Sequence, residues 1–231
     1  KVIAGVLKPT KGSVEVHGVI APLLELGAGS SDLENLVRKN FGRYDIKFVK
    51  IDGDEQYNLC ADIEVMDILS ARCYNFCIHR GPFDAIAFME VAEHLEKNHL
   101  EPMFQRISDW LKPEGMLLFT TPTPPHEGKY EDRVWPTDHK FECTFSEIYN
   151  IINKEFKINK EIGWSLEERE YNKLLESDAT LSMMASKLRG AFPESYVRAI
   201  MACLSPVQAN RQIFLVCKKR RIANGRFTQT R

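Results

Sequence analysis

A short glycine turn between two hydrophobic patterns constrains the fold of this chain most strongly. Apolar residues over 22–26, with the acidic Glu25 among them, lead into Gly27-Ala28-Gly29, and the helical pattern of 33–39 follows. This order indicates a buried strand, a tight turn and the start of a helix. Such a turn favours glycine because a Cβ would block the approach of a ligand to the backbone. Amides at the start of the helix point above the strand end, so the turn predicts a ligand site.

Strand and helix patterns alternate along most of the remaining chain. The strand patterns lie at 46–51, 60–65, 83–89, 116–122, 156–162 and 212–217. The helical patterns lie at 66–82, 100–111 and 145–152, followed by two amphipathic helices over 166–204. Regular alternation of this kind is typical of a parallel sheet that carries helices on both faces. The helices of 166–204 interrupt the sheet before its last strand, where they can form a lid over a substrate.

Composition and charge exclude several classes of function. The 231 residues carry a formal net charge of −1, so no global field attracts nucleic acid or an anionic membrane. The basic cluster begins at 218, and we expect 221–231 to form a solvated tail. No apolar run approaches the ~18 residues that cross a bilayer. The six cysteines lack zinc-site or thioredoxin spacing and no signal peptide is evident, so we expect a reducing cytoplasm.

The first 29 residues resemble a different family from the rest of the chain. Residues 1–29 resemble a segment that follows the Walker A motif in ABC-transporter ATPases of polysaccharide export. The chain has no Gly-x-x-x-x-Gly-Lys-Ser/Thr loop to hold phosphates, and we find no Walker B element downstream. We therefore expect no ATP hydrolysis and interpret 1–21 as a fused or truncated leader. An ATPase fragment stays as one alternative.

An acidic residue follows the second predicted strand. Asp52 stands where a carboxylate can accept hydrogen bonds from a ribose diol beside the glycine turn. Two further blocks, FDAIAFMEVAEHL at 83–95 and LKPEGMLLFTTP at 111–122, complete the pattern. Together with the glycine turn, these features resemble class I S-adenosylmethionine-dependent methyltransferases over about residues 22–165. Ser31 stands where that family commonly has a third glycine.

The resemblance implies a Rossmann-like, mostly parallel seven-stranded sheet with helices on both faces and a helical insertion before the last strand. It also implies a methyltransferase domain over 22–220 that includes this insertion. The glycine turn is expected beside the methionine part of the cofactor, Asp52 at the ribose, and Glu90 near the sulfonium. Asp62 or Ile63 is expected beside the adenine. The implied cofactor-binding residues are Glu25, Gly27, Ala28, Gly29, Asp52, Asp62, Ile63 and Glu90.

Four side chains around the fourth strand leave two interpretations open. Glu90, Glu93 and His94 can converge over one helical turn, and His139 arrives from the long loop after 122. Carboxylates and imidazoles together can bind a divalent metal. The set resembles the metal site of small-RNA 3′-terminal 2′-O-methyltransferases, although Cys143 and two residues later Phe145 depart from that family. In the other interpretation, which we take as the prediction, there is no metal and Glu90 orients the cofactor.

The histidines are also the candidate catalytic residues. An imidazole titrates close to neutral pH, so His139 or His94 can act as a general base toward a hydroxyl acceptor. Trp110 and Trp164 have apolar neighbours, and we expect both in the core.

The leading prediction is methyl transfer from S-adenosylmethionine to an oxygen or nitrogen of a small molecule. The preference for a sugar or glycan rests on the leader that resembles an export ATPase. The first alternative is a metal-assisted RNA 3′-terminal 2′-O-methyltransferase, although the near-neutral charge makes nucleic acid unfavoured. The second is a non-catalytic Rossmann module that binds a partner.

Overall fold

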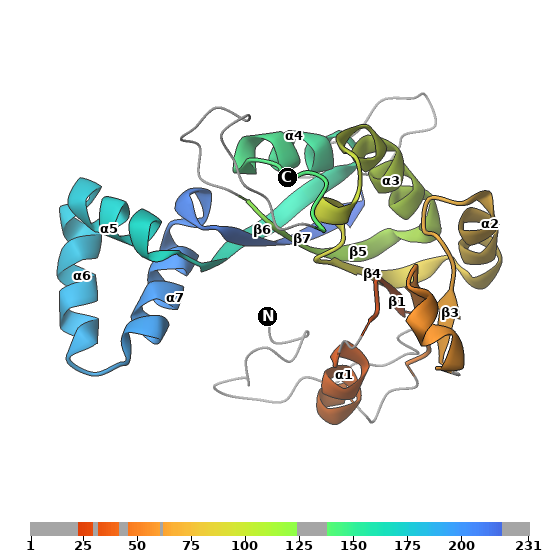
Figure 1. Ribbon diagram of the computed structural model, residues 1–231, viewed down its shortest axis with the longest axis horizontal. Helices are drawn as coiled ribbons and strands as arrows, with labels where there is room; N and C mark the ends of the chain where they lie inside the picture. Colours follow the sequence, from red (N-terminus) through yellow and green to blue (C-terminus); the bar gives the residue numbers. More distant parts are fainter. Residues whose placement is uncertain (1–22, 30–31, 42–45, 61, 124–137, 219–231) are drawn as a thin grey trace.

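The computed structural model describes residues 23–29, 32–60, 62–123 and 138–218, with 42–45 excepted (Figure 1). The predicted leader, most of the loop after 122 and the basic tail lie outside the described residues. In the part of the chain that is described, no helix has both the length and the apolar character needed to cross a bilayer.

A seven-stranded sheet with the order β3-β2-β1-β4-β5-β7-β6 forms the centre of the molecule. Strands β1 to β5 run parallel, and β7 runs antiparallel to both β5 and β6. The prediction of a mostly parallel, Rossmann-like sheet is confirmed. The strands are β1 Leu23–Leu26, β2 Phe48–Asp52, β3 Ile63–Val65, β4 Phe83–Met89, β5 Leu111–Pro122, β6 Phe156–Ser165 and β7 Arg211–Lys218.

Helices cover both faces of the sheet. α2, α3 and α4 lie together on one face, and α1 lies on the other (Figure 1). α4 begins with a capping box in which the Thr144 hydroxyl accepts from the Glu147 amide and the Glu147 carboxylate accepts from the Thr144 amide. These four helices are α1 Leu33–Phe41, α2 Ala71–Arg80, α3 Lys97–Trp110 and α4 Phe145–Glu155.

Aromatic side chains fill the space between β4, β5 and α3. Phe88 stacks on Phe119 with ring centroids 5.6 Å apart, and Phe104 of α3 meets Phe119 edge to face at 5.2 Å. Offset and edge-to-face pairs of this kind stabilise a core beyond the area that they bury. Trp110 is fully buried as predicted. The apolar spacing in the sequence therefore identified the core face of α3 correctly.

The segment between β6 and β7 differs from the expectation. It forms three helices where the pattern predicts two: α5 Glu168–Ser177, α6 Ala179–Arg189 and α7 Glu194–Leu204. The additional break falls at Asp178, whose carboxylate accepts from the amides of Thr180 and Leu181 and so caps α6. The three helices pack around an apolar cluster of their own and project from the β6 end of the sheet (Figure 1).

The prediction that Trp164 is buried is wrong. Its residue surface is 44% exposed, since it lies near the end of the edge strand β6. Apolar neighbours in the sequence cannot reveal that a residue lies at the edge of a sheet.

Candidate functional site

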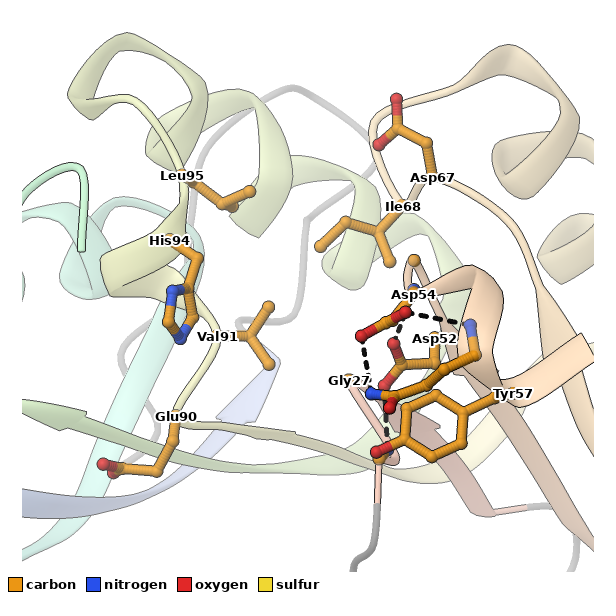
Figure 2. A pocket seen from close by; sticks show the side chains of 13 residues that line it. Gly27, Asp52, Asp54, Tyr57, Asp67, Ile68, Glu90, Val91, His94 and Leu95 are labelled. Atoms are coloured by element: carbon orange, nitrogen blue, oxygen red, sulfur yellow. Dashed lines mark hydrogen bonds between the residues drawn. The ribbon is translucent and has the colours of Figure 1, made fainter. Parts of the chain in front are cut away.

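A pocket of about 570 Å³ opens at the carboxyl edge of the parallel strands (Figure 2). It lies where the strand order reverses direction, between β1 and β4, which is the usual ligand position in an open α/β sheet. The ends of β1, β2 and β4 and the segment after β3 contribute its walls. The lining residues are Gly27, Gly29, Asp52, Gly53, Asp54, Gln56, Tyr57, Asp67, Ile68, Glu90, Val91, His94 and Leu95.

The glycine turn forms the floor of this pocket. Gly27 and Gly29 adopt left-handed backbone conformations with φ of 67° and 41°. A Cβ on Gly27 would stand 2.2 Å from Cγ2 of Val91. The requirement for glycine at 27 therefore comes first from the packing of the protein itself, a cause that the sequence does not reveal. The amides of Gly27 and Ala28 both donate to the carbonyl oxygen of Ile51, which holds the turn against β2.

Asp52 is held in place by two backbone amides. Its Oδ2 accepts from the amide of Gly29 and its Oδ1 from the amide of Asp54, each at 2.8 Å. Each carboxylate oxygen retains a further lone pair that can accept from a ligand hydroxyl. Asp52 therefore links the glycine turn to the end of β2 and faces the pocket, as the sequence predicts.

Acidic side chains dominate the charge of the pocket. Asp52, Asp54, Asp67 and Glu90 line it, and the described lining contains no lysine or arginine. This electrostatic character favours a ligand with positive charge and hydroxyl groups, and it opposes a ligand with a pyrophosphate.

Several residues predicted to bind a cofactor do not line the pocket. Glu25 is buried within β1, and Ala28 is buried under the turn. Asp62 and Ile63 lie at the amino-terminal end of β3, where Asp62 Oδ2 is 2.6 Å from Nζ of Lys50. Neither lines the pocket, because only the carboxyl end of a parallel strand reaches it.

The residues that follow β3 take that place. Asp67 and Ile68 line the pocket, although the sequence analysis did not select them. The sequence offered a signal for them, because the predicted strand over 60–65 ends at the same residue as the observed one. The predicted strand only begins three residues too early. A carboxylate and an aliphatic side chain just beyond a strand end were the features to select.

Glu90 sits at the end of β4 in a left-handed conformation, with φ of 52°. Such a conformation is uncommon for a residue other than glycine and tends to occur at functional sites. Its Oε1 accepts from the hydroxyl of Thr120 at 2.9 Å, and its Oε2 accepts from Nη1 of Arg211 at 2.5 Å. Glu90 and His94 lie across the pocket from the acidic pair Asp52 and Asp54 (Figure 2). The sequence analysis did not identify Arg211.

Three of the four residues considered for a metal come together. Ligand atoms of Glu93, His94 and His139 all lie within 4.8 Å of one another. The carbonyl oxygen of Glu93 accepts from the amides of Lys140 and Phe141, at 2.7 and 3.1 Å, and this contact brings His139 to the short helix at 92–94. Glu90 is not part of the cluster, because its carboxylate is turned to Thr120 and Arg211.

Each of the two histidines has a hydrogen-bond partner at Nδ1. Nδ1 of His94 is 3.0 Å from the carbonyl oxygen of Asp138, and Nδ1 of His139 is 2.6 Å from Oε1 of Glu142. Both partners only accept, so Nδ1 is the donor in each ring, and in the neutral form of an imidazole the other nitrogen, Nε2, keeps a lone pair. His94 lines the pocket and His139 does not, and the two rings meet edge to face with their centroids 5.0 Å apart. The lone pair on each Nε2 can take a proton or bind a cation.

Glu93 is the buried carboxylate of this cluster. Burial is the main cause that raises the pKa of its carboxyl to about 7; the negative charge of Glu90 adds to this rise, while a backbone hydrogen bond and the nearby histidines oppose it. The Thr121 hydroxyl lies 3.4 Å from Oε2 of Glu93. A carboxyl group in these surroundings changes its protonation near neutral pH.

Comparisons with known proteins agree with this geometry. A family model described as a methyltransferase domain matches residues 13–176. A SAM-dependent methyltransferase from Archaeoglobus fulgidus superposes with a TM-score of 0.53 at 15% identity, covering 86% of each chain. A cyclopropane synthase from Mycobacterium tuberculosis superposes with a TM-score of 0.51 at 16% identity, covering 85% of this chain and 78% of the other. At such identities the superpositions concern the fold. A search of curated proteins finds no match.

Proposed function

The chain belongs to the family of methyltransferase domains, and we propose that it methylates an oxygen or nitrogen atom of a small molecule, with a sugar as the expected acceptor. It is an S-adenosylmethionine-dependent methyltransferase with a Rossmann-like fold. A solved cyclopropane synthase of similar fold, with a TM-score of 0.51, was determined in complex with SAH. The observation that carries the proposal is the acidic pocket at the carboxyl edge of β1, β2 and β4.

The residues of the pocket fit this cofactor. S-adenosylmethionine carries a sulfonium, an ammonium group and a ribose diol, and the carboxylates of Asp52, Asp54 and Asp67 in the lining offer acceptors and negative charge. In this proposal Asp52 holds the ribose, because its carboxylate is already oriented by the amides of Gly29 and Asp54. Ile68 and Asp67 take the adenine side, and Glu90 and His94 take the side of the reacting methyl.

The protein contributes position and proton transfer to the reaction. The cofactor supplies the electrophilic methyl group when it is bound. The pocket walls hold the acceptor atom in line with that methyl, which supplies most of the rate enhancement. His94 lines the pocket, and because its Nδ1 is engaged with the carbonyl oxygen of Asp138, its Nε2 is the nitrogen that accepts the proton of an acceptor hydroxyl in this proposal. His139 packs edge to face against His94 and stabilises its position.

Two measurements test the proposal. Calorimetry should detect binding of S-adenosylmethionine to the purified protein, and Asp52→Ala should weaken it. Transfer of labelled methyl groups is then measured on a panel of neutral sugars, acidic sugars, small amines and a short RNA. His94→Ala should lower kcat on the acceptor and leave the affinity for S-adenosylmethionine nearly unchanged. Absence of S-adenosylmethionine binding by folded protein would refute the proposal.

A second candidate function follows from the cluster of Glu93, His94 and His139. A divalent metal held by one carboxylate and two imidazoles would orient the two ribose hydroxyls at the 3′ end of an RNA. The hydrogen bonds of the two histidines support it, because each uses Nδ1 and leaves Nε2 as the nitrogen that can bind a cation. The position of Glu90 outside the cluster argues against the metal-assisted function. Chelator treatment followed by addition of Mn²⁺ or Zn²⁺ separates the two functions: loss and recovery of methyl transfer to RNA would favour the metal-assisted enzyme.

A further inference from the structure

An exposed tryptophan and an arginine stand together beside the pocket. Trp164 near the end of β6 is 44% exposed, and the side chain of Arg211 at the start of β7 is 42% exposed. Cζ of Arg211 lies 5.8 Å from the centroid of the Trp164 ring. Nη1 of Arg211 reaches Oε2 of Glu90, which lines the pocket. The pair therefore borders the pocket at the end where we place the reacting methyl.

The backbone beneath this pair is rigid. Ser165 and Arg211 are paired across β6 and β7. Asn210, just before β7, makes three hydrogen bonds. Its amide donates to the carbonyl oxygen of Ser165, and its carbonyl oxygen accepts from the amide of Thr123, both at 2.8 Å. Its Oδ1 accepts from the amide of Glu167 at 2.7 Å. Hydrogen bonds to the ends of β5 and β6 and to the N-cap residue of α5 hold the backbone that carries the two side chains.

Gly163 strengthens this frame. A Cβ at that position would stand 2.4 Å from the carbonyl oxygen of Ala202 and 2.5 Å from Cβ of Ala209. The absence of a side chain allows the end of α7 and the turn after it to press directly on β6, one residue before Trp164. The helical segment thus supports the strand that presents the tryptophan.

Arg211 has donors to offer a ligand. A guanidinium has five N–H groups, and within the described residues only Nη1 of Arg211 has a hydrogen-bond acceptor. The charge of Glu90 is already compensated by this contact and by the hydroxyl of Thr120. An anionic group that approaches from the solvent side can therefore bind the remaining N–H groups bidentately, the geometry that arginine favours for carboxylate and phosphate.

Trp164 provides the complementary apolar surface. The indole of an exposed tryptophan beside a pocket gives a flat, rigid platform, and ring-shaped ligands bury apolar area against it. A sugar ring has an apolar face of C–H groups that fits such a platform. Arg211 then stands beside the ring, where it can reach an acidic substituent.

We propose that Trp164 and Arg211 form the acceptor subsite and that it takes a sugar ring bearing an anionic group, a carboxylate or a phosphate. The inference rests on the proposed function and specifies its acceptor. The left-handed backbone of Glu90 fits this arrangement, because it directs the carboxylate to the arginine that orients the acceptor.

The experiment measures binding of three probes to protein saturated with S-adenosylhomocysteine. Methyl β-D-glucuronide carries a carboxylate, glucose 6-phosphate carries a phosphate, and methyl β-D-glucoside is neutral. We expect at least one charged probe to bind roughly tenfold more tightly than the neutral one, since a hydrogen bond to a charged group is worth that much or more. The stronger of the two charged probes identifies the anion.

Two variants and two controls assign the effect. Arg211→Gln should abolish the preference for the charged probe, and Trp164→Ala should weaken all three probes. Arg169→Gln and Tyr196→Ala replace an exposed arginine on α5 and an exposed aromatic residue on α7 and should change nothing. Because Arg211→Gln leaves Glu90 without its partner, Arg211→Lys is included and should retain part of the preference.

Binding of S-adenosylhomocysteine tests the proposed function separately from the acceptor subsite. Folded wild-type protein that does not bind it would contradict the proposed function itself. Protein that binds it and yet shows equal affinity for the three probes, or binds none of them, would overturn the subsite. So would a preference for charged probes that survives Arg211→Gln.

Discussion

The buried carboxyl of Glu93 makes the stability of this protein depend on pH in a specific direction. Glu93 is 2% exposed, next to Thr121 and two histidines. Burial raises the pKa of its carboxyl from 4.5 to about 7, while in the unfolded chain the group returns to its ordinary value. The folded protein therefore binds the proton more tightly than the unfolded chain does. Between these two pKa values, stability must fall as pH rises.

The size of the effect follows from the shift. One pKa unit corresponds to about 1.4 kcal/mol, so the full penalty is about 3 kcal/mol. It is absent well below pH 4.5, amounts to about 1 kcal/mol at pH 5, and is complete above pH 7. Glu93→Gln keeps the size and a hydrogen-bond acceptor but carries no charge. We expect the variant to be more stable than the wild type by about 3 kcal/mol at pH 8 and by about 1 kcal/mol at pH 5.

Urea unfolding at pH 5 and pH 8, in the presence of chelator, measures this difference. Glu64→Gln is the matched control, because Glu64 is exposed on β3 and the same substitution there should change stability equally little at both pH values. An equal gain from Glu93→Gln at the two pH values would refute the electrostatic reasoning. A loss of stability at pH 8 would show that the charged carboxylate has a stabilising partner in the folded protein.

Three further predictions concern the pocket. Gly27→Ala should destabilise the fold by about 2–4 kcal/mol, because the position has a left-handed φ and the new Cβ meets Val91. Adding Val91→Ala to the same chain should recover part of this loss, as measured by thermal unfolding. Asp52→Ala should weaken S-adenosylmethionine binding at least tenfold in calorimetry, because hydrogen bonds to a charged group are worth ~1.5–3 kcal/mol each; unchanged affinity would remove Asp52 from the ribose site. Ile68→Ala should weaken the binding of S-adenosylmethionine roughly tenfold through lost apolar contact, whereas Ile63→Ala should leave it unchanged. The reverse result would show that the adenine binds at the start of β3.

The sequence was sufficient wherever the signal is local. The buried run at 83–89 is β4 with the same boundaries, and the apolar spacing of α3 identified the side chains that fill the core. Gly27, Gly29 and Asp52, which the sequence singled out, all line the pocket. Each of these features depends on the periodicity of one segment or on its conformational needs, which neighbouring residues determine.

Features that join distant segments required the tertiary structure. Arg211 meets Glu90 across 121 residues, and nothing near either residue indicates the contact. His139 reaches Glu93 only because the backbone after it donates to the carbonyl of Glu93. The exposure of Trp164 follows from its place on an edge strand. Packing decides which strand ends meet and which side chains remain in solvent, because these choices depend on the free energy of the whole sheet rather than on the pattern of one strand.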